Sequence, residues 1–355
     1  MTSAALSREQ QELATTVQAL LDRRADSAAV RRAAEDGYAV EAWRLLTEQI
    51  GAPALAIPED RGGAGFSLFE SMIVLEEVGV SLAPVPLLSS IIATELLLAL
   101  PPTTEAGELL ERIANGAVPA VVWPAHELAP LEATIVVDDG GRLTGTVTDV
   151  LEGAHAEILL VAASSDVGIG LYLVDPDRAA VVSTPSLDAT TRLATIVLDD
   201  VPATRLAADA AAALDRAALT AAAGVAVLAA GCARRGLRMT RDYSLERVQF
   251  GRPIGSFQAV KHRIADMLVQ TETARSVALT AARAVADDSA EAPDLAAAAA
   301  SHAKEAAHAV AAETIQLHGG IAITWEHDAH MVFKRAHALG QLFGPAHHHR
   351  ARLLD

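Results

Sequence analysis

Two segments in the last third of the chain carry residue types that could hold a phosphorylated ligand. In the first, Arg247 ends a long helical pattern, Phe250 lies in a turn, and Gln258 lies in the first turn of the next helix. The second segment ends a later helix and combines a glutamine with two consecutive glycines: Gln316, Gly319 and Gly320. A guanidinium group makes charge-assisted hydrogen bonds to phosphate, and glycine lets a ligand approach backbone amides closely. These residues therefore predict a pyrophosphate-binding site.

Each of these residues also has a structural interpretation that the sequence leaves open. Arg247 could complement the negative end of its helix or pair with a nearby acid. Gln258 could be a polar contact at a subunit interface, and Gly319 and Gly320 could simply end a helix. The two segments together favour a bound ligand more strongly than either segment does alone.

Composition restricts the class of protein. Of the 355 residues, 51% are hydrophobic and 21% are charged, which is typical of a folded protein. Aromatic residues make up only 3%, and alanine is abundant, which favours closely packed helices. The formal net charge of −17 argues against a nucleic-acid partner and against an anionic membrane surface.

The same reasoning applies to cysteine and to the most apolar segment. A single cysteine, Cys232, excludes an intramolecular disulfide and is expected in the core. Residues 210–230 are nearly apolar, but Asp215 and Arg216 interrupt them, so we predict a buried helix and no membrane insertion. A cytoplasmic protein is expected. No pattern of cysteines or acids accompanies the late histidines, so no metal site is predicted.

The hydrophobic pattern changes twice along the chain and predicts three domains. Residues 1–120 are predicted to form an N-terminal helical domain, in which Ser7 and Ser67 begin helices with capping boxes. Residues 121–205 contain short apolar runs between Gly, Asp and Pro, which predict a small middle β-barrel or sandwich of antiparallel strands. Residues 206–355 predict a C-terminal four-helix bundle, with helices at 207–244, 257–286, 293–317 and 327–342. The predicted fold class is α+β.

A further group of cations lies on the first of these four helices. Arg234, Arg238 and Arg241 are spaced at i, i+4 and i+7 and so form one stripe. The stripe could face a phosphate of a cofactor or of CoA, but solvated arginines that pair with acids are the favoured interpretation. Glu326 is interpreted as an acid in the first turn of the last helix.

In its order of domains and in its motifs, the chain resembles the acyl-CoA dehydrogenase family over nearly its whole length. The loop at residues 58–65 and the helix end at residues 76–79 match the family's N-terminal pattern. Residues that match its C-terminal pattern are Arg247, Phe250, Gly251, Pro253, Ile254, Phe257, Gln258, Ala265, Asp266, Met267, Gln316, His318, Gly319 and Gly320. The resemblance implies an FAD cofactor whose ADP half is held across a subunit interface by the two segments. It also implies an oligomer that α,β-desaturates acyl-CoA thioesters and passes electrons to an electron-transfer flavoprotein-type acceptor.

The catalytic residue of the family is missing from its expected positions. The reaction needs a carboxylate that removes the α-proton of the thioester while the β-hydrogen leaves as a hydride to the flavin. At the two positions where the family carries this glutamate, the chain has Gly344 and Ala221. Neither can accept a proton, so no catalytic residue is predicted. Residues 122–130 lack the family's acidic-glycine loop, and residues 147–156 lack the tryptophan that covers the flavin ring.

The favoured interpretation is one subunit of a hetero-oligomer. Some actinobacterial members of the family work as α2β2 tetramers, in which one subunit supplies the catalytic glutamate and the other supplies part of the FAD site. Residues 324–327 resemble the second kind of subunit, and the resemblance points to steroid side-chain or other bulky acyl-CoA substrates. Two alternatives stay open. One is a self-sufficient homotetramer with its base at Asp215 or Glu326, and the other is a scaffold subunit without flavin.

Overall fold

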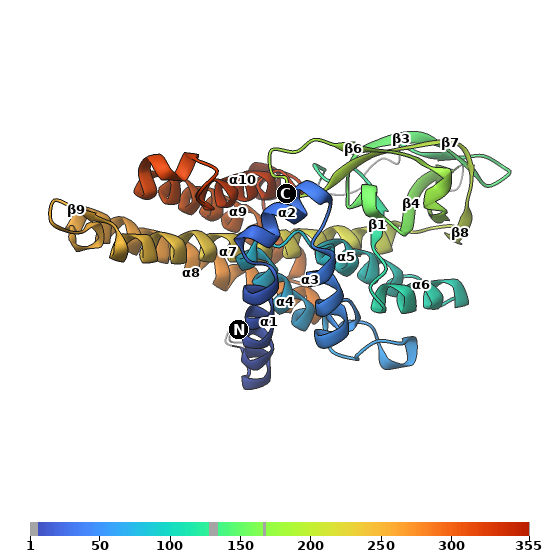
Figure 1. Cartoon of the computed structure of the whole chain (residues 1–355). Helices are drawn as coiled ribbons and strands as arrows, with labels where there is room; N and C mark the ends of the chain where they lie inside the picture. The colour runs from blue at the N-terminus through green and yellow to red at the C-terminus, as the bar shows by residue number, and fades with distance from the viewer. Residues whose placement is uncertain (1–5, 128–133, 166–167, 355) are drawn as a thin grey trace.

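A computed structural model describes residues 6–127, 134–165 and 168–354. Helices form the first part of the chain, strands form the middle, and helices form the remainder, so the predicted fold class is confirmed (Figure 1). The sheet lies at one end of the long C-terminal helices, and the N-terminal helices pack near their middle. Residues 128–130, part of the segment in which the acidic-glycine loop was sought, lie outside the described residues.

The N-terminal helices begin where their caps predict. Their bounds are α1 Arg8–Arg24, α2 Ser27–Asp36, α3 Val40–Leu45, α4 Leu68–Ser81, α5 Leu87–Leu98 and α6 Thr104–Ala114. Both capping boxes are confirmed, since the side chain of Ser7 accepts from the Gln10 amide and the side chain of Glu70 accepts from the Ser67 amide. Nearly every residue of α4 and α5 is buried, because other helices cover both of their faces.

Helices α4 and α7 (Ala211–Glu246) cross in backbone contact. A Cβ atom added to Gly79 would lie 2.6 Å from a carbonyl oxygen of α7, and one added to Gly231 would lie 2.3 Å from the Glu76 oxygen. Only glycine permits such an approach. The buried Glu76 carboxylate accepts hydrogen bonds from Arg234 of α7 and from Arg275 of α8 (Gln258–Ala286). This network joins the N-terminal helices to the C-terminal helices.

The middle region forms one sheet. Its strands are β1 Pro119–Val122, β2 Val136–Val137, β3 Arg142–Leu151, β4 Ile158–Ser165, β5 Gly168–Val174, β6 Ala180–Thr184, β7 Leu193–Pro202 and β8 Thr204–Ala207. The order is β6-β7-β3-β2-β4-β5-β8, with β1 paired to β4. Most neighbours are antiparallel, as expected, but β4 is parallel to both β1 and β2. The purely antiparallel expectation was wrong, because strand direction depends on where the chain enters the sheet rather than on local pattern.

The C-terminal helices differ from their predicted bounds by at most four residues at any end, and the largest differences are at the start of the first helix and the end of the last. Helices α7 and α8 are followed by α9 Ala292–His318, α10 Ala329–Leu339 and the short α11 Ala346–Ala351. The predicted start of the first helix at residue 207 is wrong, because residues 204–207 pair with β5 as strand β8. The predicted helix at 327–342 is shorter at both ends. Left-handed backbone at Phe343 and Gly344, with φ of 53° and 85°, turns the chain beyond it.

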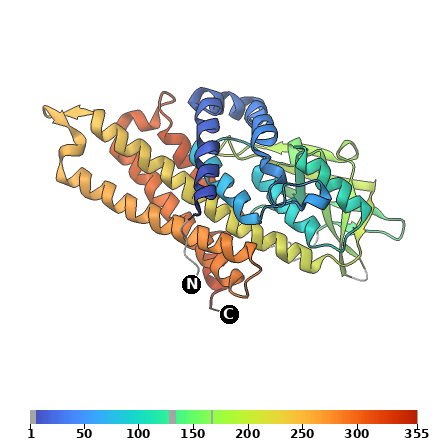
Figure 2. The same ribbon diagram turned by 90° about the horizontal axis from the view of Figure 1, so that it is seen from below.

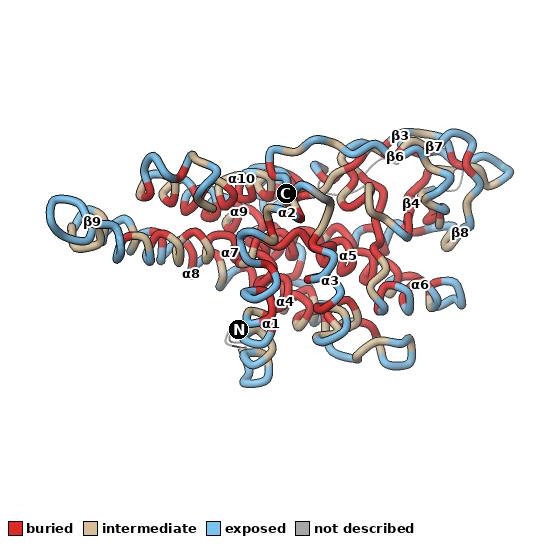
Figure 3. The backbone as a smooth tube through the Cα atoms, in the orientation of Figure 1, coloured by how far each residue is buried: buried red, intermediate tan, exposed pale blue. Residues whose placement is uncertain are grey.

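Strands β9 Val248–Gln249 and β10 Arg252–Pro253 form a hairpin between α7 and α8 that projects from the rest of the chain (Figure 2). The hairpin is exposed, whereas the middle of α7 is buried (Figure 3). Helix α7 is long and apolar enough to cross a membrane, but 89% of its most apolar window is buried inside the protein. This burial supports its interpretation as a core helix, and Cys232 within it is fully buried as expected.

Candidate functional site

The α7–α8 hairpin presents Arg247 to solvent at the point where α7 ends. Its backbone N–H donates to the Tyr243 oxygen at 2.8 Å, and its carbonyl accepts from the Ile254 N–H at 2.8 Å. The backbone of Arg247 therefore caps α7, while its side chain is exposed and makes no hydrogen bond or ion pair within the described residues. The guanidinium group is free to bind an anion.

The tip of the hairpin displays an aromatic ring. Phe250 is 93% exposed and has a left-handed backbone with φ of 52°, followed by Gly251 with φ of 77°. Its ring meets Phe257 edge-on with 6.2 Å between centroids, and the Arg252 guanidinium lies 4.1 Å from the centroid of the Phe257 ring. Gln258 begins α8, and its exposed side chain has no hydrogen-bond partner in the described part of the chain.

Helix α9 ends at the paired glycines. Gly319 has φ of 65° and ψ of −144°, which side chains disfavour, and its N–H donates to the Ile315 oxygen. A Cβ atom at Gly319 or at Gly320 would meet no atom within 4 Å, so the space above both residues is open. Gln316 lies in the last turn of α9 and is exposed. The helix end therefore offers an open backbone and a nearby amide side chain.

Three neighbouring aromatic rings bring the two helix ends together. Tyr243 of α7 stacks on His318 of α9, with centroids 4.4 Å apart and planes at 25°. His327, which precedes α10, has its ring centroid 4.5 Å from that of His318. An ion pair of 3.3 Å between Arg263 and Glu313 also joins α8 to α9. The ends of α7 and α9 thus lie side by side, and with them lie the two segments that sequence analysis singled out.

These features fit one half of a flavin dinucleotide. A free guanidinium group, free amide side chains and open glycine backbone are the donors that a pyrophosphate and its riboses require. All of them lie on the surface, where a ligand held mainly by another chain could reach them. The residues of this chain therefore fit the ADP end of FAD.

The two positions at which a catalytic carboxylate was sought are occupied by other contacts. Ala221 is fully buried within α7. The carbonyl of Gly344 accepts a hydrogen bond from the buried Lys304, whose Nζ also lies 2.7 Å from the Leu342 oxygen. Burial lowers the pKa of Lys304 to about 7. This lysine holds the turn at residues 342–344 in place, and neither position offers a carboxylate.

The space beside this turn is closed. Phe343 and Trp123 meet edge to face with centroids 5.7 Å apart, and the Phe343 N–H donates to the Ala125 oxygen at 2.5 Å. The cavity that Trp123 and Phe343 line is about 10 Å³, close to the least that one water molecule needs. A flavin ring does not fit this cavity.

Sequence analysis missed a buried carboxylate near the same turn. Glu152 is 6% exposed, has φ of 58°, and its Oε2 has no hydrogen-bond partner among the described residues. Burial, opposed by the charges of Arg192 and Arg335, raises the pKa of Glu152 to about 7. Glu152 and Leu342 both line an enclosed cavity of about 30 Å³. The position of Glu152 between an apolar strand and Gly153 signals a turn locally, but burial there comes from distant elements.

The remaining candidates are explained by exposure or by ion pairs. Asp215 and Glu326 are both exposed, and neither lines the two interior cavities. Arg234 of the arginine stripe pairs with Glu76 and Glu77 as expected, but its side chain is only 14% exposed, so the expectation that it is solvated was wrong. The described residues contain no group of three or more side chains that could hold a metal ion.

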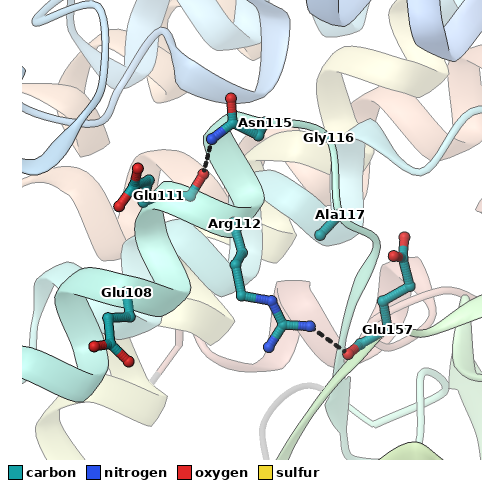
Figure 4. A pocket seen from close by; sticks show the side chains of 7 residues that line it. All are labelled: Glu108, Glu111, Arg112, Asn115, Gly116, Ala117 and Glu157. Atoms are coloured by element: carbon teal, nitrogen blue, oxygen red, sulfur yellow. Dashed lines mark hydrogen bonds between the residues drawn. The ribbon is translucent and has the colours of Figure 1, made fainter.

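A larger surface pocket lies between α6 and the start of β4. Figure 4 shows this pocket of about 520 Å³. Two of its polar side chains bond to the backbone, since Arg112 donates to the Glu157 carbonyl oxygen at 3.0 Å and Asn115 donates to the Glu111 carbonyl oxygen at 2.9 Å. Three carboxylates around one arginine would repel the phosphates of CoA or of a nucleotide. None of the predicted site residues lies in it.

Comparison with known proteins places this architecture in one enzyme class. The sequence pattern of the acyl-CoA dehydrogenase N-terminal domain matches residues 7–117, and that of the C-terminal domain matches residues 204–354. The chain therefore belongs to the acyl-CoA dehydrogenase family of oxidoreductases, which act on CH–CH bonds and usually bind FAD. It is 40% identical to acyl-CoA dehydrogenase IpdE2 of Mycolicibacterium smegmatis over 352 residues, which span 98% of each chain.

Two solved structures, a steroid ACAD and a two-protein complex, also resemble the chain. The Tcur3481-Tcur3483 steroid ACAD, as a G363A variant, superimposes with a TM-score of 0.86 at 31% identity and covers 98% of this chain and 97% of that chain. The ChsE4-ChsE5 complex of Mycobacterium tuberculosis superimposes with a TM-score of 0.86 at 28% identity, covering 99% and 98%.

Proposed function

We propose that this chain is the subunit without a catalytic base in a heteromeric acyl-CoA dehydrogenase. It would assemble with a catalytic subunit of the same family as an α2β2 tetramer in the cytoplasm. The substrate would be an acyl-CoA thioester with a bulky acyl group such as a steroid side chain. The electron acceptor would be an electron-transfer flavoprotein-type protein. The similarity to IpdE2, to the steroid ACAD and to the two-protein complex supports the substrate class and the mode of assembly.

The observation that carries this proposal is the contrast between the two halves of the cofactor site. The exposed helix ends carry Arg247 with an unpaired guanidinium group and Gly319 beneath open space. Among the described residues beside the turn at 342–344, Trp123 and Phe343 line a cavity of about 10 Å³, and Leu342 lines another of about 30 Å³. A chain of this kind can bind the ADP end of a cofactor whose flavin ring lies in a partner subunit.

Each residue at the helix ends would have a defined role in binding the ADP end of FAD. FAD, when bound, supplies the hydride acceptor of the desaturation. The guanidinium group of Arg247 would neutralise phosphate charge, and Gln258 and Gln316 would donate hydrogen bonds from their amides. Gly319 and Gly320 would let the backbone approach the nucleotide, and the exposed ring of Phe250 would pack against it. The general base would come from the partner.

The alternative of a self-sufficient homotetramer is weakened by the exposure of Asp215 and Glu326. Among the described carboxylates near the 342–344 turn, Glu152 is the one that faces an enclosed cavity, but about 30 Å³ is far too small for a thioester. The variant Glu152→Gln in the assembled complex distinguishes a subunit without a catalytic base from a self-sufficient enzyme whose base is Glu152. Unchanged desaturation with full FAD content is expected here, whereas lost desaturation with FAD retained would make Glu152 a base.

The direct test of the FAD site is the variant Arg247→Ala, co-expressed with the catalytic partner. We expect FAD binding to weaken by about 1.5–3 kcal/mol, since a charge-assisted hydrogen bond is lost. Arg178→Ala is a matched control, because Arg178 is an exposed arginine on the β-domain, away from the helix ends. The visible spectrum of the purified complex gives the FAD content. FAD retention equal to that of the control would remove Arg247 from the site.

A further inference from the structure

Tyr243 stacks on His318, and the ring of His327 lies tilted against that of His318, beneath the exposed ends of α7 and α9. We call these three rings the ring stack. The backbones of two of these residues are joined directly to the FAD-binding segments. The Tyr243 carbonyl accepts the Arg247 N–H at 2.8 Å, and Gly319 follows His318 in the chain. We infer that Tyr243 and His318 are positioning residues, whose stacking fixes where the Arg247 guanidinium lies relative to the glycine backbone at Gly319. This inference rests on the proposed function.

His318 is held in one orientation. Its ring is 4% exposed, and Nδ1 lies 2.7 Å from the Thr314 carbonyl oxygen, to which it donates. Nε2 is buried and has no hydrogen-bond partner among the described residues, so stacking and this one bond hold the ring. The Thr314 hydroxyl in turn accepts from the Thr240 hydroxyl of α7 at 3.2 Å. The last turn of α9 is thus fixed to α7 directly below the site.

The third ring is fixed from the other side. Nδ1 of His327 accepts the Ala329 N–H at 3.2 Å at the start of α10. The next residue, Asp328, accepts from Arg31 of α2 at 2.6 Å and from Arg235 of α7 at 3.3 Å. Four elements therefore converge on the stack, and none of these contacts involves the free side chains of the FAD-binding segments. The stack supports the site without occupying it.

A stacked ring pair defines an angle as well as a distance, because two flat faces must remain nearly parallel. The planes of Tyr243 and His318 meet at 25°, whereas aliphatic side chains of equal volume would leave the two helix ends free to rotate slightly. The side chain of Arg247 makes no hydrogen bond or ion pair within the described residues, so its place is set through its backbone, which is bonded to Tyr243. Its position relative to Gly319 thus depends on the stack.

The test measures the rate of FAD release from the purified complex by the rise in flavin fluorescence. Tyr243→Leu keeps an apolar side chain without a ring, and we expect release to be faster by about three- to ten-fold. Tyr243→Phe keeps the ring and should release FAD at the wild-type rate. If Tyr243→Leu does not assemble with the partner, Tyr243→Met takes its place.

A double-mutant cycle separates positioning from general destabilisation. Because the stack acts through Arg247, Tyr243→Leu should add little to the release rate in an Arg247→Ala background. An equal acceleration in both backgrounds, or none in the wild-type background, would overturn the inference and leave the proposed function intact. If Arg247→Ala itself left FAD release unchanged, the proposed function would fail instead.

Discussion

Replacement of Glu152 by glutamine tests the electrostatics of the closed interior. The glutamate is 6% exposed, and burial raises its pKa from an ordinary 4.5 to about 7. Between these two values the folded protein keeps a proton that the unfolded chain has lost. The free energy of unfolding therefore falls as pH rises from 4.5 to 7, by about 1.4 kcal/mol per pH unit and about 3 kcal/mol in total.

Glutamine is neutral at every pH and fills nearly the same volume. Glu152→Gln should therefore match the wild type near pH 4.5 and exceed its stability by about 3 kcal/mol at pH 8. Urea unfolding followed by tryptophan fluorescence measures this difference, and subtracting the two proteins at each pH cancels titrations that they share. Asp199→Asn, an exposed change on β7, is the matched control and should show no such trend.

A difference that is flat with pH would refute the reasoning. So would a glutamine variant that is less stable than the wild type at pH 8. Either result would mean that Glu152 is ionised in the fold and stabilised by Arg192 or Arg335, whose charges oppose the effect of burial. Glu152 would then belong to the charged network that Arg335 and Asp188 form beside it.

Three further predictions concern packing and buried charge. Gly231→Ala should destabilise the protein by about 1–3 kcal/mol, because its Cβ would lie 2.3 Å from the backbone carbonyl oxygen of Glu76. A Cβ at Gly107 would meet no atom within 4 Å, so Gly107→Ala should be neutral or stabilising in the same urea titration. Glu76→Ala should lower the free energy of unfolding by about 3–5 kcal/mol, because it leaves Arg234 and Arg275 without their shared carboxylate. Glu12 is exposed, so Glu12→Ala should lower it by less than about 1 kcal/mol. Equal effects of the two variants would contradict the role of burial. Burial lowers the pKa of Lys304 from 10.5 to about 7, so the unfolded chain binds a proton between these values that the folded protein does not. The free energy of unfolding of the wild type should therefore fall as pH falls from 10.5 to 7. A difference in the free energy of unfolding between the wild type and Lys304→Met that does not change with pH would disprove this.

Helix caps, turns and helix ends depend on residues close together in the chain, and these features could be predicted from the sequence. The capping boxes at Ser7 and Ser67 depend on residues three positions apart, so they could be read directly from the chain. The turn at Phe250 and the helix end at Gly319 were found for the same reason, since Gly251 and Gly319 mark them locally in the sequence, and the structure has positive φ at all three residues. The tasks assigned to these residues in binding FAD stay predictions.

Features that depend on distant segments could not be predicted. The first long helix was predicted to begin at Ala207, because the pairing of Ala207 with Leu171 of β5 as the end of strand β8 joins segments distant in the sequence. Glu152 resembles a turn residue in the sequence, and its burial comes from helices and loops far away in the chain. The contact between Tyr243 and His318 joins residues on two different helices. No spacing rule within one helix indicates such a pair.

The FAD content of this chain, purified alone and purified with a catalytic partner, tests the division of the cofactor site most directly. The closed interior at Trp123 and Phe343 and the free guanidinium group of Arg247 predict a colourless chain alone and a yellow complex. A chain that is fully loaded with FAD in the absence of any partner, and that desaturates an acyl-CoA by itself, would contradict the proposal.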